Sequence, residues 1–250
     1  MLKTKRYASL QNSKIRSELA LSLSSAKEAG GSQPITSTSD VNQFFVAFVQ
    51  GKLRALPWTP EALSVESNTI RDALVALNTL GMLTISSQPA VDSAPSDDPL
   101  YGWGPVGGRV YQKAYVEFFC SPDLWARLLR EVLQQPQAGR LSYMAVRAQG
   151  GVVTSRHGFK RSTVTWGVFA DMEIVESTVI DEDGLLLWRD QAFQLWRTSW
   201  ADRATAASAR AVLLDIQATY WLVNIIDDDF KQQQPGQLFA TLCALLNKAS

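Results

Sequence analysis

The chain has 250 residues, of which 46% are hydrophobic, so it can bury a substantial core and is not expected to be globally disordered. Its 24 Lys and Arg residues balance 24 Asp and Glu residues. This lack of a basic excess argues against a nucleic-acid-binding protein and against a protein of the membrane surface. No apolar run is long enough to predict a membrane span.

The first 38 residues are predicted to form a helical lead-in and a flexible linker, and residues 39–250 to form one folded domain. Ser39 or Asp40 is placed to cap a helix that follows. The apolar face of that helix comprises Val41, Phe44, Phe45, Phe48 and Val49. The basic start of the chain leaves an organelle-targeting role open.

The middle of the chain alternates between helix and strand signals. Ser67 is a candidate N-cap for a helix that ends at Gly81, and residues 82–86 are predicted to form a strand. Residues 88–108 are rich in Pro, Asp, Ser and Gly and are expected to form one long loop, a feature that is often functional. Residues 109–120 follow as a single predicted strand, and Ser121-Pro122-Asp123 is predicted to begin a helix.

The last part of the chain continues this mixture without a βαβ repeat. Strands are predicted over residues 141–147, 163–169, 185–188 and 220–226, and helices over 189–200, 204–218 and 236–246. The pattern therefore predicts an α+β fold with mixed β-sheets flanked by helices.

Few residues indicate metal or redox chemistry. Cys120 and Cys243 lack the spacing of a metal site and are expected to be free buried thiols in a reducing compartment, which favours the cytoplasm. His157 is the only histidine and is expected in a solvated loop. Asp227, Asp228 and Asp229 are consecutive, so their carboxylates point in different directions and are expected to be a solvated strand end. No metal site and no catalytic residues are predicted.

Two further features could bind a ligand. The run from Gly102 to Gly107 matches G-x-G-x-x-G, but a proline-rich loop precedes it, a strand follows it, and Pro105 lacks an amide that would bind phosphate. The glycines are better explained as allowing a tight loop that packs Trp103. Glu66 lies among hydroxyl and amide side chains just before a helix; the residues alone favour a role in supporting the N-terminus of that helix.

Several long motifs resemble the C-terminal regulatory domain of methylenetetrahydrofolate reductase, from about residue 40 to the end. They are LPW at 56–58, Glu66-Ser67, LTISSQP at 83–89, PSDDP at 95–99, GWGPVGG at 102–108, YQKAYVEFF at 111–119, VTWGVF at 164–169 and YWLVNIIDDDF at 220–230. Three departures from the family pattern matter. Ser67 stands for Thr and keeps the hydroxyl, Ser86 stands for Asn, and Asp92-Ser93 stands for Asn-Gly, which is expected to alter the turn of the loop.

The resemblance implies a domain that senses S-adenosylmethionine or S-adenosylhomocysteine and controls the reductase by allostery. It implies ligand contacts from Glu66, Ser67, Thr84, Ser87, Thr165 and Thr178, with a main-chain contact from Ser64. Glu66 would pair with the ligand's ammonium group, and hydroxyls would meet its other polar edges. The resemblance also implies a homodimer.

The family's catalytic part is a flavin-binding TIM barrel of roughly 300 residues, a size in line with barrel domains, and this chain has no room for it. The chain alone is therefore expected to bind neither FAD nor NAD(P)H and to lack reductase activity; a barrel encoded separately or removed stays open. Two alternatives are a methyltransferase that uses S-adenosylmethionine and a dimerisation module without a ligand. The sequence does not begin with a strand, a glycine-rich loop and a helix, the arrangement that a methyltransferase would need. The set of hydroxyl side chains together with Glu66 argues against a dimerisation module that has no ligand.

Overall fold

The computed structural model describes residues 35–53, 56, 63–134, 141–147, 151–154, 161–169, 173–187, 189–190, 203–229 and 237–248. The helices are α3 (Thr38–Val49), the 3₁₀-helix η1 (Val65–Ile70), α4 (Arg71–Thr79), α5 (Pro122–Leu128), the π-helix η2 (Leu129–Leu133), α7 (Arg203–Thr219) and α8 (Gln237–Lys248). The strands are β1 (Leu83–Gln88), β2 (Val91–Pro95), β3 (Arg109–Gln112), β4 (Tyr115–Cys120), β5 (Leu141–Arg147), β6 (Val152–Thr154), β7 (Arg161–Val168), β8 (Ile174–Asp181) and β9 (Trp221–Asp227).

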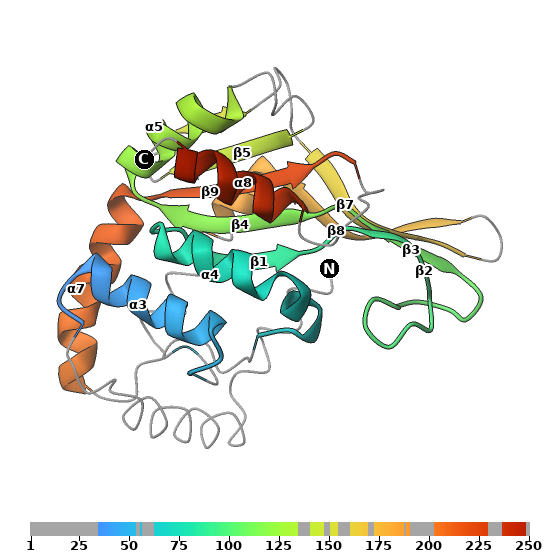
Figure 1. The fold of residues 1–250 in the computed structure, drawn as a ribbon, viewed down its shortest axis with the longest axis horizontal. Helices are drawn as coiled ribbons and strands as arrows, with labels where there is room; N and C mark the ends of the chain where they lie inside the picture. The colour runs from blue at the N-terminus through green and yellow to red at the C-terminus, as the bar shows by residue number, and fades with distance from the viewer. Residues whose placement is uncertain are drawn as a thin grey trace.

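Two antiparallel sheets organise these elements, which confirms the predicted α+β class. One sheet has the strand order β1-β4-β9-β5-β6 and the other the order β2-β3-β7-β8. β1 runs into β2 through Pro89 and Ala90, and β3 runs into β4 through Lys113 and Ala114. We call these two crossings, with the residues next to them, the joint between the sheets. From the joint, the four-stranded sheet projects beyond the helices (Figure 1).

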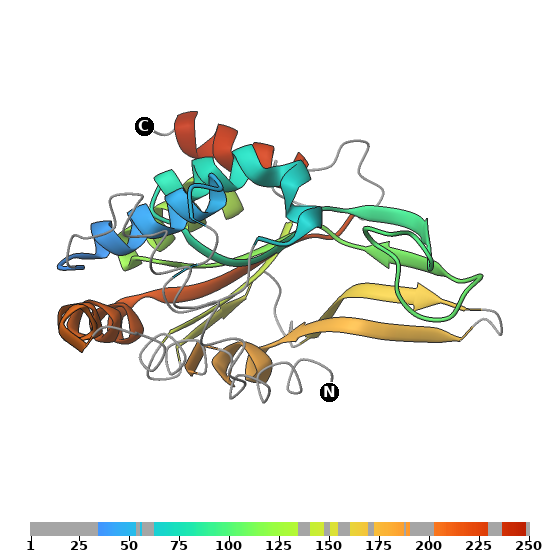
Figure 2. The same ribbon diagram turned by 90° about the horizontal axis from the view of Figure 1, so that it is seen from below.

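Each face of the five-stranded sheet has its own hydrophobic core. On one face α4, α5 and α8 pack against side chains such as Val116, Phe118 and Val223. On the other face α7 contributes Ala209, Leu213 and Ile216 to a core with Phe119 and Leu222. Figure 2 shows α7 on the side of the sheet opposite α4 and α8. Helix α3 lies beside both α4 and α7.

Many predicted helices and strands are confirmed. Helix α4 is followed by Gly81 at φ +95°, and the Met82 amide donates to the Leu77 carbonyl, so the helix ends where glycine predicted it. Ser121 caps α5 through its side chain, and its neighbour Pro122 is the first helical residue. Strands β1, β5, β7 and β9 and helices α7 and α8 lie within one or two residues of their predicted bounds.

Several other predictions were wrong. The N-cap of α3 is Ser37, whose side chain accepts from the Asp40 amide, so neither Ser39 nor Asp40 is the cap. Ser67 does not cap a helix either, because it lies inside η1. Residues 182–187 are helical, although 185–188 were expected to form a strand.

Two errors concern strands near the joint. Residues 88–108 are not one loop, because β2 occupies Val91–Pro95. Within β2 the register shifts between Val91 and Ala94, and Ser93 has φ +63° at a position where the resembled family has glycine. Residues 109–120 form two strands in different sheets, since β3 pairs with β7 and β4 pairs with β9.

Candidate functional site

The first group of candidate residues lies on η1. Ser67 is buried, and its hydroxyl lies 2.9 Å from the hydroxyl of Ser64, the residue before η1. The side chain of Glu66 is half-buried, and its main-chain carbonyl accepts from Thr69 Oγ1 at 2.9 Å. The short helix thus presents one carboxylate and two hydroxyls within four residues.

The charge of Glu66 acts on a buried phenol across the edge of the sheet. Burial raises the pKa of Tyr115 to about 12, and the negative charges of Glu117 and Glu66 add to the rise, while a hydrogen bond with Ser86 opposes it. The Ser86 and Tyr115 hydroxyls lie 3.2 Å apart. The negative charges of Glu66 and Glu117 would favour a cationic group in the region around Tyr115.

Strand β1 carries candidate residues at the edge of the five-stranded sheet. The Thr84 side chain is held by Asn78 of α4, whose Nδ2 donates to Thr84 Oγ1 at 2.7 Å, and whose Oδ1 accepts from the Thr84 amide at 3.2 Å. Thr84 and Ser87 pair in register with core residues of β4 that face α4. These two hydroxyls consequently lie on the same face of the sheet as α4.

The residues next to Ser87 face the other way. Ser86 pairs with Glu117 and Gln88 with Tyr115, and a register shift between Thr84 and Ser86 separates the two sets. A bulge of this kind changes which face successive side chains occupy. The β1 edge therefore offers hydroxyls on one face and a hydroxyl and an amide on the other.

The remaining candidate residues lie together in the four-stranded sheet. Thr165 of β7 and Thr178 of β8 are direct cross-strand partners, and Gln112 of β3 pairs with Thr165 from the other side. Thr165 is only 4% exposed, and its Oγ1 lies 3.4 Å from Gln112 Oε1 and 3.5 Å from Gln88 Oε1. The contact with Gln88 brings the end of β1 next to the Thr165 group.

Sequence reasoning missed four residues that shape this site: Asn78, Gln88, Gln112 and Tyr115. Gln88, Gln112 and Tyr115 lie inside the motifs LTISSQP and YQKAYVEFF, where attention went to hydroxyls and carboxylates. Asn78 had a different signal, because it is a polar residue on the otherwise apolar inner side of its helix. In the structure Asn78 is fully buried. A buried amide needs hydrogen-bond partners, so the position of Asn78 predicts hydrogen bonds to a neighbouring element.

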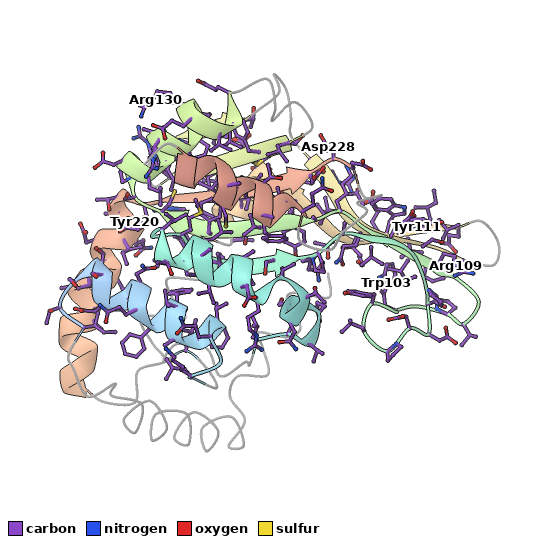
Figure 3. All side chains as sticks on the ribbon, in the orientation of Figure 1. Trp103, Arg109, Tyr111, Arg130, Tyr220 and Asp228 are labelled. Atoms are coloured by element: carbon purple, nitrogen blue, oxygen red, sulfur yellow. The ribbon has the colours of Figure 1, made fainter. Side chains whose placement is uncertain are left out.

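The loop between β2 and β3 is built around an aromatic ring, as its glycines predicted. The Trp103 and Phe169 rings meet edge to face with centroids 5.5 Å apart. Gly104 has φ +86°, and a Cβ on Gly108 would lie 2.1 Å from Phe169 Cδ1. The glycines therefore admit the Phe169 ring rather than a pyrophosphate. Figure 3 shows Trp103 on this loop, at the projecting sheet.

The aspartates at the end of β9 are structural rather than fully solvated, which corrects their prediction. Asp227 is completely buried. Asp228, which is labelled in Figure 3, forms an ion pair with Lys113 of the joint at 3.3 Å and accepts from Ser142 Oγ at 2.6 Å. Within the described residues, no group of three or more His, Cys, Asp or Glu side chains could hold a metal ion.

Other predictions have partial answers. Cys120 and Cys243 are free, and Cys120 is buried as expected, whereas Cys243 is only half-buried. His157, the lead-in over residues 1–34 and most of the helix predicted over 189–200 lie outside the described residues. None of the helices in the described part of the chain is long and apolar enough to cross a membrane.

Comparison with known proteins gives consistent matches. The family model described as "MTHFR, SAM-binding regulatory domain" matches residues 32–245. The chain is 40% identical over 209 residues to methylenetetrahydrofolate reductase (NADH) 1 of Zea mays, covering 83% of this chain and 34% of that protein. It is 41% identical to a probable methylenetetrahydrofolate reductase (NADH) of Oryza sativa subsp. japonica, over the same shares of 83% and 34%. Methylenetetrahydrofolate reductase 1 of Schizosaccharomyces pombe is 35% identical over 79% of this chain and 32% of its own length. The chain thus spans about a third of the length of these relatives.

Proposed function

The chain belongs to the family of S-adenosylmethionine-binding regulatory domains of methylenetetrahydrofolate reductase, and from this premise we propose which residues bind the effector and what the binding does. The effector is S-adenosylmethionine or S-adenosylhomocysteine. Glu66 pairs with its ammonium group, and Ser67, Thr84, Ser87, Thr165 and Thr178 contact its other polar groups, with Ser64 adding a main-chain contact. The methyltransferase alternative is not favoured, because the matching family is regulatory.

One observation supports this assignment above the others: at the joint, Gln88 at the end of β1 in one sheet lies beside Thr165 of the other, with Gln88 Oε1 3.5 Å from Thr165 Oγ1. A ligand bound there would touch both sheets. A ligand that binds one arrangement of the two sheets more tightly than another raises the population of the arrangement that it prefers. A change at the joint can therefore be passed on to a catalytic partner that contacts the domain.

The wider proposal concerns assembly. The chain acts in folate and methionine metabolism by controlling a methylenetetrahydrofolate reductase barrel, encoded elsewhere or removed from this chain. The domain itself works as a cytoplasmic homodimer that binds neither FAD nor NAD(P)H and has no reductase activity. The regulatory character of the matching family supports this proposal.

The substitution Glu66→Gln tests the assignment. Removing the charge while keeping the shape should weaken binding of S-adenosylmethionine by about 1–3 kcal/mol, the scale of a hydrogen bond to a charged group. Isothermal calorimetry measures this change. Glu173→Gln is the matched control, because Glu173 is exposed and just precedes β8.

The control should bind like the unaltered chain. Equal affinity of the Glu66→Gln variant and the control would remove Glu66 from the site. No binding of either S-adenosyl compound to the unaltered chain would overturn the proposed function as a whole.

A further inference from the structure

At the second crossing, the chain passes from one sheet to the other across a single peptide unit. The Lys113 amide donates to the Val164 carbonyl at 2.8 Å, which continues the ladder between β3 and β7. The carbonyl of the next residue, Ala114, accepts from the Asp227 amide at 2.9 Å, which continues the ladder between β4 and β9. A change in the angle between the sheets must therefore be absorbed by backbone torsions at this peptide unit and at the other crossing.

The side chain of Lys113 reaches across this crossing. Its amide is bonded to the four-stranded sheet, whereas its Nζ lies 3.3 Å from Oδ1 of Asp228, the residue that follows β9 in the five-stranded sheet. The other carboxylate oxygen of Asp228 accepts from Ser142 Oγ of β5 at 2.6 Å, and Ser142 is fully buried. Bending the joint would thus pull the ammonium group away from a carboxylate that is anchored to the next strand of the sheet.

The surroundings of this ion pair make it sensitive to salt without making it negligible. The side chains of Lys113 and Asp228 are 20% and 24% exposed. Their attraction is therefore stronger than that of a fully exposed pair, but ions in the solvent can still screen it. The pair between Arg161 and Glu176 differs, because it joins two strands of the same sheet and does not cross the joint.

We propose that the ion pair between Lys113 and Asp228 is a salt-sensitive latch, a contact that holds the angle between the two sheets. While the pair is intact, the projecting sheet opens only together with the five-stranded sheet. When salt screens the pair, the projecting sheet opens by itself more often. This inference goes beyond the proposed function, because the latch acts whether or not a ligand is bound.

Amide hydrogen exchange measured by NMR tests the latch. The quantity of interest is the opening constant of amides in β3 and β7 divided by that of amides in β4 and β9, so that effects common to both sheets cancel. In the unaltered chain this ratio should be near one at about 0.01 M salt, where the Debye length is about 30 Å. It should rise about 5-fold at about 1 M salt, where the Debye length is about 3 Å.

Two variants remove the latch from opposite sides. Asp228→Asn removes the charge but keeps an oxygen that can accept from Ser142, and Lys113→Met keeps the main-chain bond to Val164. Each variant should show the ratio raised about 5-fold already at low salt, with no further change as salt is added. The double variant should match the single variants, because both substitutions remove the same interaction.

Glu131→Gln is the matched control. It weakens an ion pair with Arg127 whose side chains are 29% and 24% exposed, close to the values at the joint, but which lies on α5 and η2. Its ratio should equal that of the unaltered chain at each salt concentration.

The outcomes decide the proposal without reference to effector binding. Equal ratios in Asp228→Asn, Lys113→Met and the control would overturn the latch. Equally faster exchange in both sheets would also overturn it, because the pair would then support general stability and not the joint. If neither variant folds, the salt series of the unaltered chain decides: a rising ratio supports the latch, and a constant ratio overturns it.

Discussion

At the scale of single residues, a polar row crosses the five-stranded sheet near the proposed site. Ser86, Glu117, Asn224 and Met144 are successive cross-strand partners on β1, β4, β9 and β5. Asn224 Nδ2 donates to Glu117 Oε2 at 3.2 Å, and both residues are buried. Because buried charges are costly unless they are compensated, this hydrogen bond from Asn224 stabilises the Glu117 carboxylate.

Tyr115 should stabilise the fold in a pH-dependent way. Its folded-state pKa is raised from 10.0 to about 12, so the folded protein holds the phenolic proton more tightly than the unfolded chain does. This stabilisation is complete below pH 10 and is lost as the pH rises through about 12. The loss should amount to about 2–3 kcal/mol.

Urea unfolding of the unaltered chain and of Tyr115→Phe between pH 8 and 12 measures this effect. The variant should be less stable at pH 8 by about 1 kcal/mol, because it lacks the hydrogen bond to Ser86. The difference should then shrink and change sign as the pH rises. Burial also raises the pKa of Cys120, but that contribution is common to both proteins. Parallel curves would contradict the role of Tyr115.

At the scale of elements, the start of α3 is fixed by a reciprocal cap. Ser37 accepts from the Asp40 amide at 3.2 Å, and Asp40 Oδ2 accepts from the Ser37 amide at 2.9 Å. Ser37→Ala should lower the free energy of unfolding by about 1 kcal/mol. Chemical denaturation measures it, with Ser39→Ala as control, since Ser39 lies exposed inside the helix. A larger loss from Ser39→Ala would place the cap later in the chain.

The sequence predicted elements well where the local pattern and the end signals agreed, as in α4 with Gly81 and α5 with Ser121. It did not predict that residues 109–120 divide between two sheets, because the backbone stays extended through Lys113 and Ala114 and only pairing with β7 or β9 separates the strands. Strand β8 was missed since the side chains of its first four residues are exposed, apolar and polar alike. The apolar run LLLW at 185–188 fits a strand and a helix equally well.

The candidate site shows the same division. The resemblance to the family identified its hydroxyl residues one by one. The sequence could not predict which face of the sheet each hydroxyl occupies, because the register shift between Thr84 and Ser86 interrupts the alternation of side chains along β1. The approach of Gln88 to Thr165 joins residues 77 positions apart and depends on the whole topology.

At the scale of the whole molecule, we expect a homodimer. Eight Trp residues and a net charge of zero favour burial of aromatic surface between copies and offer no general repulsion. Static light scattering at micromolar concentration should give a mass near twice 27.6 kDa. A mass near 27.6 kDa that does not rise with concentration would show a monomer instead. Dilution in the presence of the effector tests whether binding and association are linked.

The two crossings at the joint also govern how the chain gains and loses its structure. Strands β1 and β4 continue directly into β2 and β3, so we expect the two sheets to unfold as one cooperative unit. Subglobal opening of the projecting sheet should then cost nearly as much as complete unfolding, and amides in both sheets should exchange with solvent at similar rates. The central pairing of β4 with β9 joins positions 107 residues apart, as between Glu117 and Asn224. Such distant closure makes refolding slow, because a large part of the chain must be ordered before that pairing forms.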